Sequence, residues 1–118
     1  MDRAKEIVKL ACAALEDKKA KDITILDIGK VTVIADYFII ASGDNERQVT
    51  AMTDGVDEAL GRAGFEKKSI EGYATRRWVL MDYGDVVIHI FNSEDRLFYD
   101  LERIWRDGKR VTAAELDQ

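Results

Sequence analysis

The segment RRWVLMDYGDVVIHIF, residues 76–91, constrains the fold more than any other part of the chain. Two apolar runs flank the sequence Asp82-Tyr83-Gly84-Asp85, which is the pattern of two strands joined by a tight turn. The segment is therefore predicted to form a β-hairpin. A hairpin that served only as core would need aliphatic side chains alone, so its aromatic, imidazole and acidic residues require a separate explanation.

The pairing of the two strands decides which side chains share a face. We expect Tyr83-Gly84 to form a two-residue loop, because glycine at the second loop position supports a primed turn. One face is then almost wholly aliphatic and is predicted to be core, with the pairs Val79–Ile88, Met81–Val86 and Arg77–Ile90. The other face is chemically mixed, with the pairs Leu80–Val87, Trp78–His89 and Asp82–Asp85.

The mixed face allows two interpretations. Trp78 and His89, the chain's only histidine, can lie beneath a helix as part of the core. Alternatively, Trp78 is an exposed aromatic anchor with an acidic rim, which is the composition of an interface hot spot. The two opposed aspartates favour a cationic partner, since like charges directly opposite one another destabilise a hairpin slightly. Spacing alone does not separate the two interpretations.

Helical periodicity predicts three further elements. Apolar residues recur at three- and four-residue steps over residues 3–18 and 46–62, which is typical of amphipathic helices. Asn45 and Gln48 have the spacing of a capping box at the start of the second helix. A last helix is predicted to begin near Ser93 and to carry the apolar stripe Leu97, Phe98, Leu101, Ile104 and Trp105.

Strands are predicted at residues 22–28 and 36–42, with a charged edge strand at residues 66–71. The element order is then α-β-β-α-β-β-β-α, which predicts a single α+β domain with a mixed sheet covered by helices. This domain is expected to span residues 1–107. Residues 108–118 are expected to form a loosely held polar tail, because few large apolar residues occur there.

Composition limits the function. The chain has 118 residues, 47% of them hydrophobic, so its core needs neither disulfides nor a structural metal. A formal charge of −5 argues against nucleic-acid binding, which needs clustered Lys and Arg, and favours a basic protein partner. No apolar run is long enough for a signal peptide or membrane span, and the single cysteine suits a reducing compartment. We expect a cytoplasmic protein.

The sequence offers little for catalysis. One histidine and one cysteine, far apart, do not predict a metal site. Ser42-Gly43 before a helix is the kind of turn at which nucleotidyltransferases bind phosphate, but the next strand lacks the Asp-x-Asp pair that holds magnesium. Asp44 and Glu46 would also repel a triphosphate. We expect no catalytic residue, metal or cofactor, and a catalytically active or nucleotide-binding nucleotidyltransferase-like protein remains an alternative.

Three blocks, DYFIIASGDNERQV, EGYATRRWVLMDYGDVVIHIF and RLFYDLERIW, resemble signature sequences of the ribosomal silencing factor family, also called the Iojap family. The resemblance extends over residues 3–107. It implies a nucleotidyltransferase-like fold without the catalytic carboxylates, and therefore a protein that is not an enzyme. It also implies a translational repressor that binds the large ribosomal subunit through ribosomal protein uL14 and sterically blocks joining of the small subunit, notably when nutrients are scarce.

The resemblance implies that the partner surface lies in the family's W-V-L-x-D-Y-G-D block. With the mixed hairpin face, this predicts seven partner-binding residues: Trp78, Leu80, Asp82, Tyr83, Gly84, Asp85 and His89. Arg76 and Arg77 depart from the small or polar residues expected before the tryptophan, so we assign them no role. The resemblance allows a homodimer away from the ribosome, and a large-subunit assembly factor without anti-association activity remains an alternative.

Overall fold

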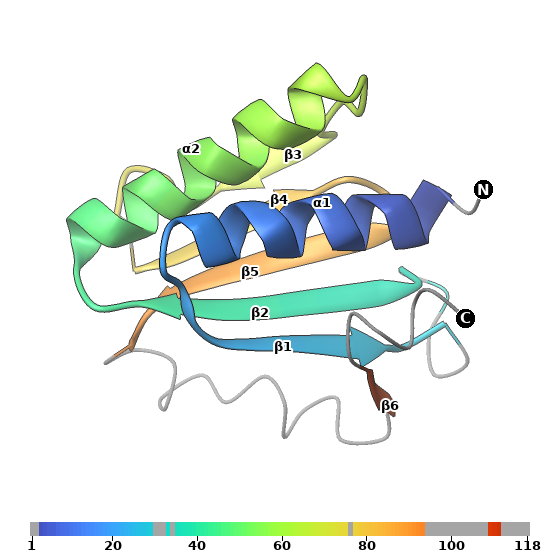
Figure 1. Cartoon of the computed structure of the whole chain (residues 1–118), viewed down its shortest axis with the longest axis horizontal. Coiled ribbons are helices and arrows are strands. Elements are labelled where there is room, and N and C mark those ends of the chain that lie inside the picture. Colours follow the sequence, from blue (N-terminus) through green and yellow to red (C-terminus); the bar gives the residue numbers. More distant parts are fainter. Residues whose placement is uncertain (1–2, 30–32, 34, 76, 94–108, 112–118) are drawn as a thin grey trace.

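The computed structural model describes residues 3–29, 33, 35–75, 77–93 and 109–111 of the chain. Within them, all strands form one sheet in the order β3-β4-β5-β2-β1-β6, and both helices lie on the same face of it (Figure 1). The elements in chain order are α1 (Arg3–Asp17), β1 (Lys21–Asp27), β2 (Tyr37–Gly43), α2 (Glu46–Arg62), β3 (Ser69–Glu71), β4 (Trp78–Asp82), β5 (Val86–Asn92) and β6 (Lys109–Val111).

The sheet is mixed, as predicted. β2 and β5 run parallel at its centre, and every other neighbouring pair is antiparallel. A parallel pair needs a long crossover connection, and the chain between β2 and β5 contains α2, which covers the sheet. The predicted α+β class is therefore confirmed. Among the described residues, no helix is long and apolar enough to cross a membrane.

The predicted cap of α2 by Asn45 is confirmed, whereas the Gln48 side chain accepts from the N–H of Asp44 rather than from that of Asn45. Asn45 Oδ1 accepts a hydrogen bond from the Gln48 backbone N–H at 2.8 Å. The Gln48 side chain accepts from the Asp44 N–H at 2.6 Å and donates to the carbonyl oxygens of Lys19 at 2.9 Å and Lys18 at 3.2 Å. Asn45 therefore caps α2, and the Gln48 side chain joins this cap to the carbonyl groups of Lys18 and Lys19 just after α1.

The main core lies between the helices and the sheet. The aliphatic face of the hairpin belongs to it as predicted, since Val79, Met81, Ile88 and Ile90 are at most 1% exposed. Apolar residues from α1, α2 and the central strands complete this core, including Ile7, Val8, Leu15, Ile39, Val49, Met52, Val56 and Leu60.

The hairpin register differs from the predicted one by two residues. The loop is Gly84-Asp85, because the Tyr83 N–H donates to the Val86 carbonyl at 2.9 Å. Primed turns need a positive φ at their first central residue, and Gly84 has a φ of +90°, which tyrosine would adopt only with strain. The observed pairs are Trp78–Phe91, Val79–Ile90, Leu80–His89, Met81–Ile88 and Asp82–Val87.

The predicted pairs, including Trp78–His89 and Asp82–Asp85, are therefore wrong. The predicted division into two faces is still correct for the strand residues, because a shift of two residues keeps each of them on its own face, whereas Asp85 lies in the loop. Asp82 lies opposite an apolar residue, Val87, and the two aspartates are not directly opposed.

The sheet continues beyond the predicted domain boundary at residue 107. Lys109–Val111 form β6 and pair with β1, placing Val111 opposite Ile25. These three residues belong to the sheet rather than to a loose tail. A strand this short contains one large apolar residue and has no alternation that would reveal it. The predicted last helix lies outside the described residues.

Candidate functional site

The candidate site is built on β4, whose residues alternate between the two faces of the sheet. Val79 and Met81 point to the helices and are buried. Trp78, Leu80 and Asp82 point to the opposite face and remain partly exposed. β4 is the second strand from the edge of the sheet, and the edge strand β3 beside it is only three residues long. This row is therefore close to the edge of the sheet. The structure thus brings together three of the predicted partner-binding residues in one row.

Trp78 and Leu80 lie at the margin of a second apolar cluster, on the sheet face that carries neither α1 nor α2. The buried members of this cluster are Leu26, Ile28, Ala35, Phe38, Ile40, Val87 and Phe91. The Trp78 ring stacks on Phe91 at 5.4 Å between centroids and an interplanar angle of 24°. Trp78 therefore packs on the cluster while the residue as a whole stays partly exposed, and its role in partner binding stays a prediction.

His89 is buried beneath this row. Its side chain is 3% exposed, and its Nδ1 atom accepts a hydrogen bond from Trp78 Nε1–H at 3.1 Å. The ring meets the edge of Phe38 at 4.7 Å between centroids. Burial among these groups lowers the pKa of His89 from 6.5 to about 4, because a buried imidazole loses the hydration that stabilises its charged form. His89 is too buried to offer a surface of its own to a partner.

Tyr83 points to the other face of the sheet, into the core below the helices. It is 1% exposed, and its hydroxyl has no hydrogen-bond partner among the described residues. Burial, with a smaller contribution from the charge of Asp57, raises the pKa of Tyr83 to about 12. Tyr83 is therefore separated from the row formed by Trp78, Leu80 and Asp82.

The two aspartates of the hairpin tip also have different surroundings. Asp82 Oδ1 accepts the Gly84 N–H at 2.8 Å, which stabilises the turn. Asp85 is exposed and lies 3.5 Å from Arg3 Nη1 of α1, while its carbonyl accepts from the N–H groups of Asp36 and Tyr37. Asp85 thus joins the turn to α1 and to the start of β2, whereas Asp82 belongs to the row on β4.

The structure adds a residue that the sequence interpretation missed. Strand pairing places Glu71 of β3 beside Leu80 and Ser69 beside Asp82, on the same face of the sheet. Both β3 residues are exposed, so Glu71 contributes a second carboxylate next to Leu80. We call Trp78, Leu80, Asp82 and Glu71 the β3–β4 surface. The sequence pattern predicted a charged edge strand here. It did not give the register of that strand against β4, so it did not show that Glu71 lies beside Leu80.

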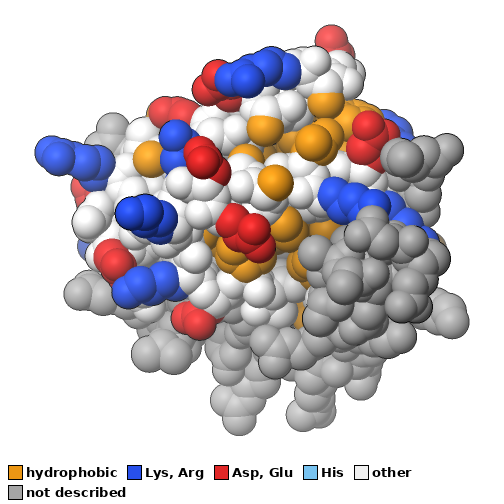
Figure 2. Space-filling model, in the orientation of Figure 1, with side chains coloured by type: hydrophobic (Ala, Val, Ile, Leu, Met, Phe, Trp, Pro, Cys, Tyr) orange, Lys and Arg blue, Asp and Glu red, His pale blue; other side chains and the backbone are white. Residues whose placement is uncertain are grey.

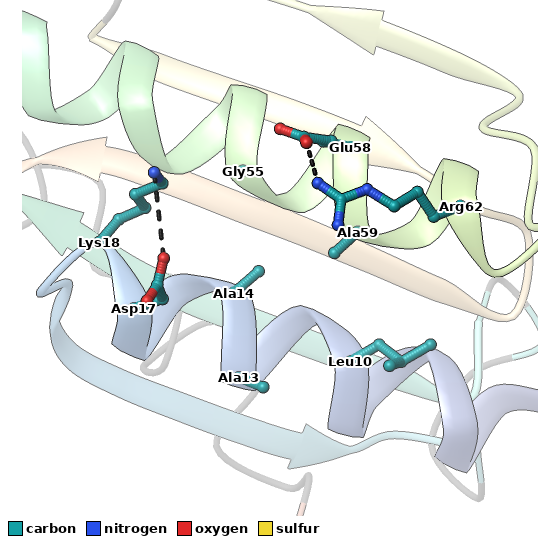
Figure 3. Close-up of a pocket in the computed structure, with 9 residues that line it drawn as sticks. All are labelled: Leu10, Ala13, Ala14, Asp17, Lys18, Gly55, Glu58, Ala59 and Arg62. Atoms are coloured by element: carbon teal, nitrogen blue, oxygen red, sulfur yellow. Dashed lines mark hydrogen bonds and ion pairs between the residues drawn. The ribbon is translucent and has the colours of Figure 1, made fainter.

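The face covered by the helices is different in character. Figure 2 shows acidic and basic side chains interspersed on it, with small apolar patches between them. A groove of about 450 Å³ lies between α1 and α2, and the floor includes Leu10, Ala14, Gly55 and Ala59 (Figure 3). The charged groups at its rim are already paired, Lys18 with Asp17 and Arg62 with Glu58. The groove offers no group suited to acid–base chemistry beyond these pairs.

Ser42 and Gly43, the predicted phosphate-binding turn, are the last two residues of β2 and are closely packed. Ser42 is fully buried, and a Cβ atom added to Gly43 would lie 3.1 Å from Met52 Sδ and 3.2 Å from the Val49 nitrogen. The capping contacts of Asn45 and Gln48 occupy N–H groups that a phosphate would need. In the part of the chain that the structure describes, no three His, Cys, Asp or Glu side chains are grouped so that they could hold a metal ion.

Comparisons with known proteins agree with the resemblance in the sequence. The family model described as RsfS, ribosomal silencing factor during starvation, matches residues 1–118. The ribosomal silencing factor of Bacillus subtilis is 42% identical over 104 residues, which are 88% of each chain. That of Chromobacterium violaceum is 45% identical over 104 residues, covering 88% of this chain and 85% of the relative.

Solved structures show the same fold. A crystal structure of a Chromobacterium violaceum protein superimposes with a TM-score of 0.86 at 40% identity and covers 99% of this chain and 100% of the other. A Bacillus halodurans structure has a TM-score of 0.81 at 37% identity and covers 91% and 97% of the two chains. From the match over its whole length and from these relatives, the chain belongs to the ribosomal silencing factor family.

Proposed function

We propose that the chain is a translational repressor that binds the large ribosomal subunit through ribosomal protein uL14 and sterically blocks joining of the small subunit. The observation that carries this proposal is the β3–β4 surface, in which a partly exposed tryptophan and leucine are flanked by Asp82 and Glu71. Family membership directs the proposal to the ribosome. The apolar centre and acidic rim of the surface match a basic ribosomal protein.

The mechanism needs no chemistry. The protein measures 34 × 33 × 25 Å, so binding on the surface where the subunits meet excludes the small subunit by volume. Because bound repressor and joined subunits exclude each other, the protein shifts the equilibrium towards free large subunits in proportion to its occupancy. We further propose that the protein is a cytoplasmic, non-enzymatic binding factor that forms a homodimer when it is not on the ribosome.

A second candidate function is assembly of the large subunit. A mouse relative named mitochondrial assembly of ribosomal large subunit protein 1 is 29% identical over 105 residues, which cover 86% of this chain and 46% of the relative. An assembly factor would use the same binding surface, yet it would sediment with immature particles and leave subunit joining unchanged.

Sucrose-gradient sedimentation separates the two functions. Purified protein is mixed with large subunits, small subunits are then added, and the gradient reports both co-sedimentation and the yield of joined ribosomes. The repressor should travel with large subunits and reduce the yield in a concentration-dependent way. Co-sedimentation with no change in joining would leave assembly as the function, and failure on both counts would refute the proposal.

Matched variants assign the effect to the β3–β4 surface. Trp78→Ala truncates its aromatic residue, and Leu10→Ala is the control, since Leu10 is a partly buried apolar residue in the groove on the opposite side of the sheet. Trp78→Ala should neither co-sediment with large subunits nor reduce the yield of joined ribosomes. Leu10→Ala should do both. Equal affinities for the two variants would place the contact elsewhere.

A further inference from the structure

We infer that His89 is a positioning residue, whose Nδ1 atom holds the indole of Trp78 in the orientation that the partner contacts. The inference rests on the proposed function, because it explains how the central aromatic side chain of the β3–β4 surface is held. The geometry on which it stands is the hydrogen bond of 3.1 Å from Trp78 Nε1–H to His89 Nδ1.

The hydrogen bond defines the state of the imidazole. Nδ1 can accept only when it carries no proton, so the neutral ring must carry its proton on Nε2. Burial, which leaves His89 3% exposed, disfavours the charged ring and so keeps Nδ1 available as an acceptor at neutral pH. The acceptor is therefore a permanent feature of the folded protein under ordinary conditions.

Two contacts with described residues help to orient the indole. Stacking on Phe91, at 5.4 Å and 24°, sets the plane of the Trp78 ring but allows it to slide and turn within that plane. The hydrogen bond to Nδ1 fixes the direction of the indole N–H within that plane. The acceptor is itself held in place, since the imidazole lies against Phe38 and stacks parallel to Phe91 within 10°. An aromatic side chain held in this way loses less conformational entropy when a partner covers it.

The second ring nitrogen of His89, Nε2, lowers the stability of the fold. This atom is buried and has no hydrogen-bond partner among the described residues. An unsatisfied buried polar group is unfavourable, and an apolar ring in this aromatic cluster would avoid that cost. A role in packing alone would favour phenylalanine at position 89, whereas orientation of Trp78 requires an acceptor there.

Two substitutions at this position separate packing from positioning. His89→Phe keeps an aromatic ring and removes the acceptor. His89→Asn keeps an acceptor, because its amide oxygen can take the place of Nδ1, but it packs less well. We expect His89→Phe to unfold at a urea concentration at least as high as His89→Asn and still bind large subunits about fivefold more weakly than wild type, the loss expected for one neutral hydrogen bond. His89→Asn should bind more tightly than His89→Phe.

The donor side provides an independent test. Trp78→Phe removes the N–H group and should itself weaken binding about fivefold. In that background, His89→Phe should cause no further loss, since the hydrogen bond is already absent. The indole N–H signal of Trp78 in a nitrogen–proton NMR spectrum, assigned by its disappearance in Trp78→Phe, should shift in His89→Phe and move back towards the wild-type position in His89→Asn.

The outcomes distinguish this inference from the proposed function. Wild-type affinity in His89→Phe, together with weak binding by Trp78→Ala, would overturn the positioning role and leave the proposed function intact. Additive losses in the double variant would overturn it too. If His89→Phe fails to fold, wild-type affinity in Trp78→Phe decides against the inference in the same way. Absence of binding by the unmodified protein would instead refute the proposed function.

Discussion

Mild acid should destabilise this protein through one residue, His89. In the native state burial lowers the pKa of its imidazole to about 4, whereas in the unfolded chain the group titrates near its ordinary value of 6.5. Between these two values the unfolded state binds a proton that the native state does not bind. Stability is therefore fully present above about pH 6.5, falls as the pH drops below that value, and reaches its lower limit below about pH 4.

The magnitude follows from the two pKa values. A fall from 6.5 to about 4 corresponds to a total loss of roughly 3 kcal/mol at about 1.4 kcal/mol per pKa unit. About 2 kcal/mol of this should already be lost at about pH 5. His89 is the chain's only histidine, and carboxyl groups ordinarily titrate nearer to 4, so the range from about pH 7.5 to about pH 5 reports mainly on this imidazole.

Urea unfolding at these two pH values tests the reasoning, with His89→Phe as the control that cannot titrate. The free energy of unfolding of the wild type should fall by about 2 kcal/mol more than that of the variant, at an unchanged dependence on urea. His89→Asn serves as a second control that also lacks the imidazole. Equal pH dependence in the wild type and both variants would refute the claim that a buried neutral imidazole causes the loss.

Three further predictions address the surface and the backbone. Trp78→Ala should weaken binding to purified large subunits in a pelleting assay by at least about 2 kcal/mol, the size of a hot-spot truncation. Asp82→Lys and Glu71→Lys should each weaken binding more at low salt than at high salt, because screening reduces a charge effect; equal losses at both would contradict an electrostatic contact. Gly72→Ala should lower stability by about 2 kcal/mol or more in thermal unfolding, because its φ is +78° and the added Cβ would lie 2.0 Å from the Trp78 carbonyl oxygen. Gly61→Ala in α2 is the control, since its added Cβ meets nothing within 4 Å beyond the nearby backbone of its own helix and its chain neighbours, and it should raise stability by about 0.5–1 kcal/mol.

The charge predictions need a matched control, and α1 provides one. Glu16 is exposed on the helix that covers the opposite face of the sheet. Glu16→Lys changes the net charge by the same amount as Asp82→Lys or Glu71→Lys. It should leave large-subunit binding close to that of the wild type. A comparable loss in this variant would show that net charge, rather than the β3–β4 surface, governs the interaction.

The hairpin shows how far a sequence pattern reaches. Alternation along residues 78–82 and 86–91 correctly assigned every side chain to a face, since the period of two is a local property of a strand. It did not determine the register, because moving the loop from Tyr83-Gly84 to Gly84-Asp85 leaves both faces unchanged. The positive φ of Gly84 decided the register, and with it the pairing of Leu80 with His89.

The candidate site was predictable only in part for a related reason. The predicted residues Trp78, Leu80 and Asp82 lie together in one row, but Tyr83 turns into the helix-covered core and Asp85 pairs with Arg3. Neighbours in sequence at a turn point in different directions, so a contiguous motif does not define a contiguous surface. The resemblance to a known family identified residues 78–85 as the block that carries the partner surface. The geometry of the turn divides the side chains of this block between the two faces of the sheet.

The sequence by itself determined the class of fold, the extent and cap of α2, the two faces of the hairpin and the family, because each depends on local periodicity or on an ordered set of residues. Only the tertiary structure decided that β6 completes the sheet, that Glu71 lies beside Leu80, and that His89 is buried with its Nδ1 on the indole of Trp78. These features join residues that are 9 to 86 positions apart in the chain, as the pairs Glu71–Leu80 and Ile25–Val111 show. Local patterns carry no information on such pairings, which packing and strand register alone bring into contact.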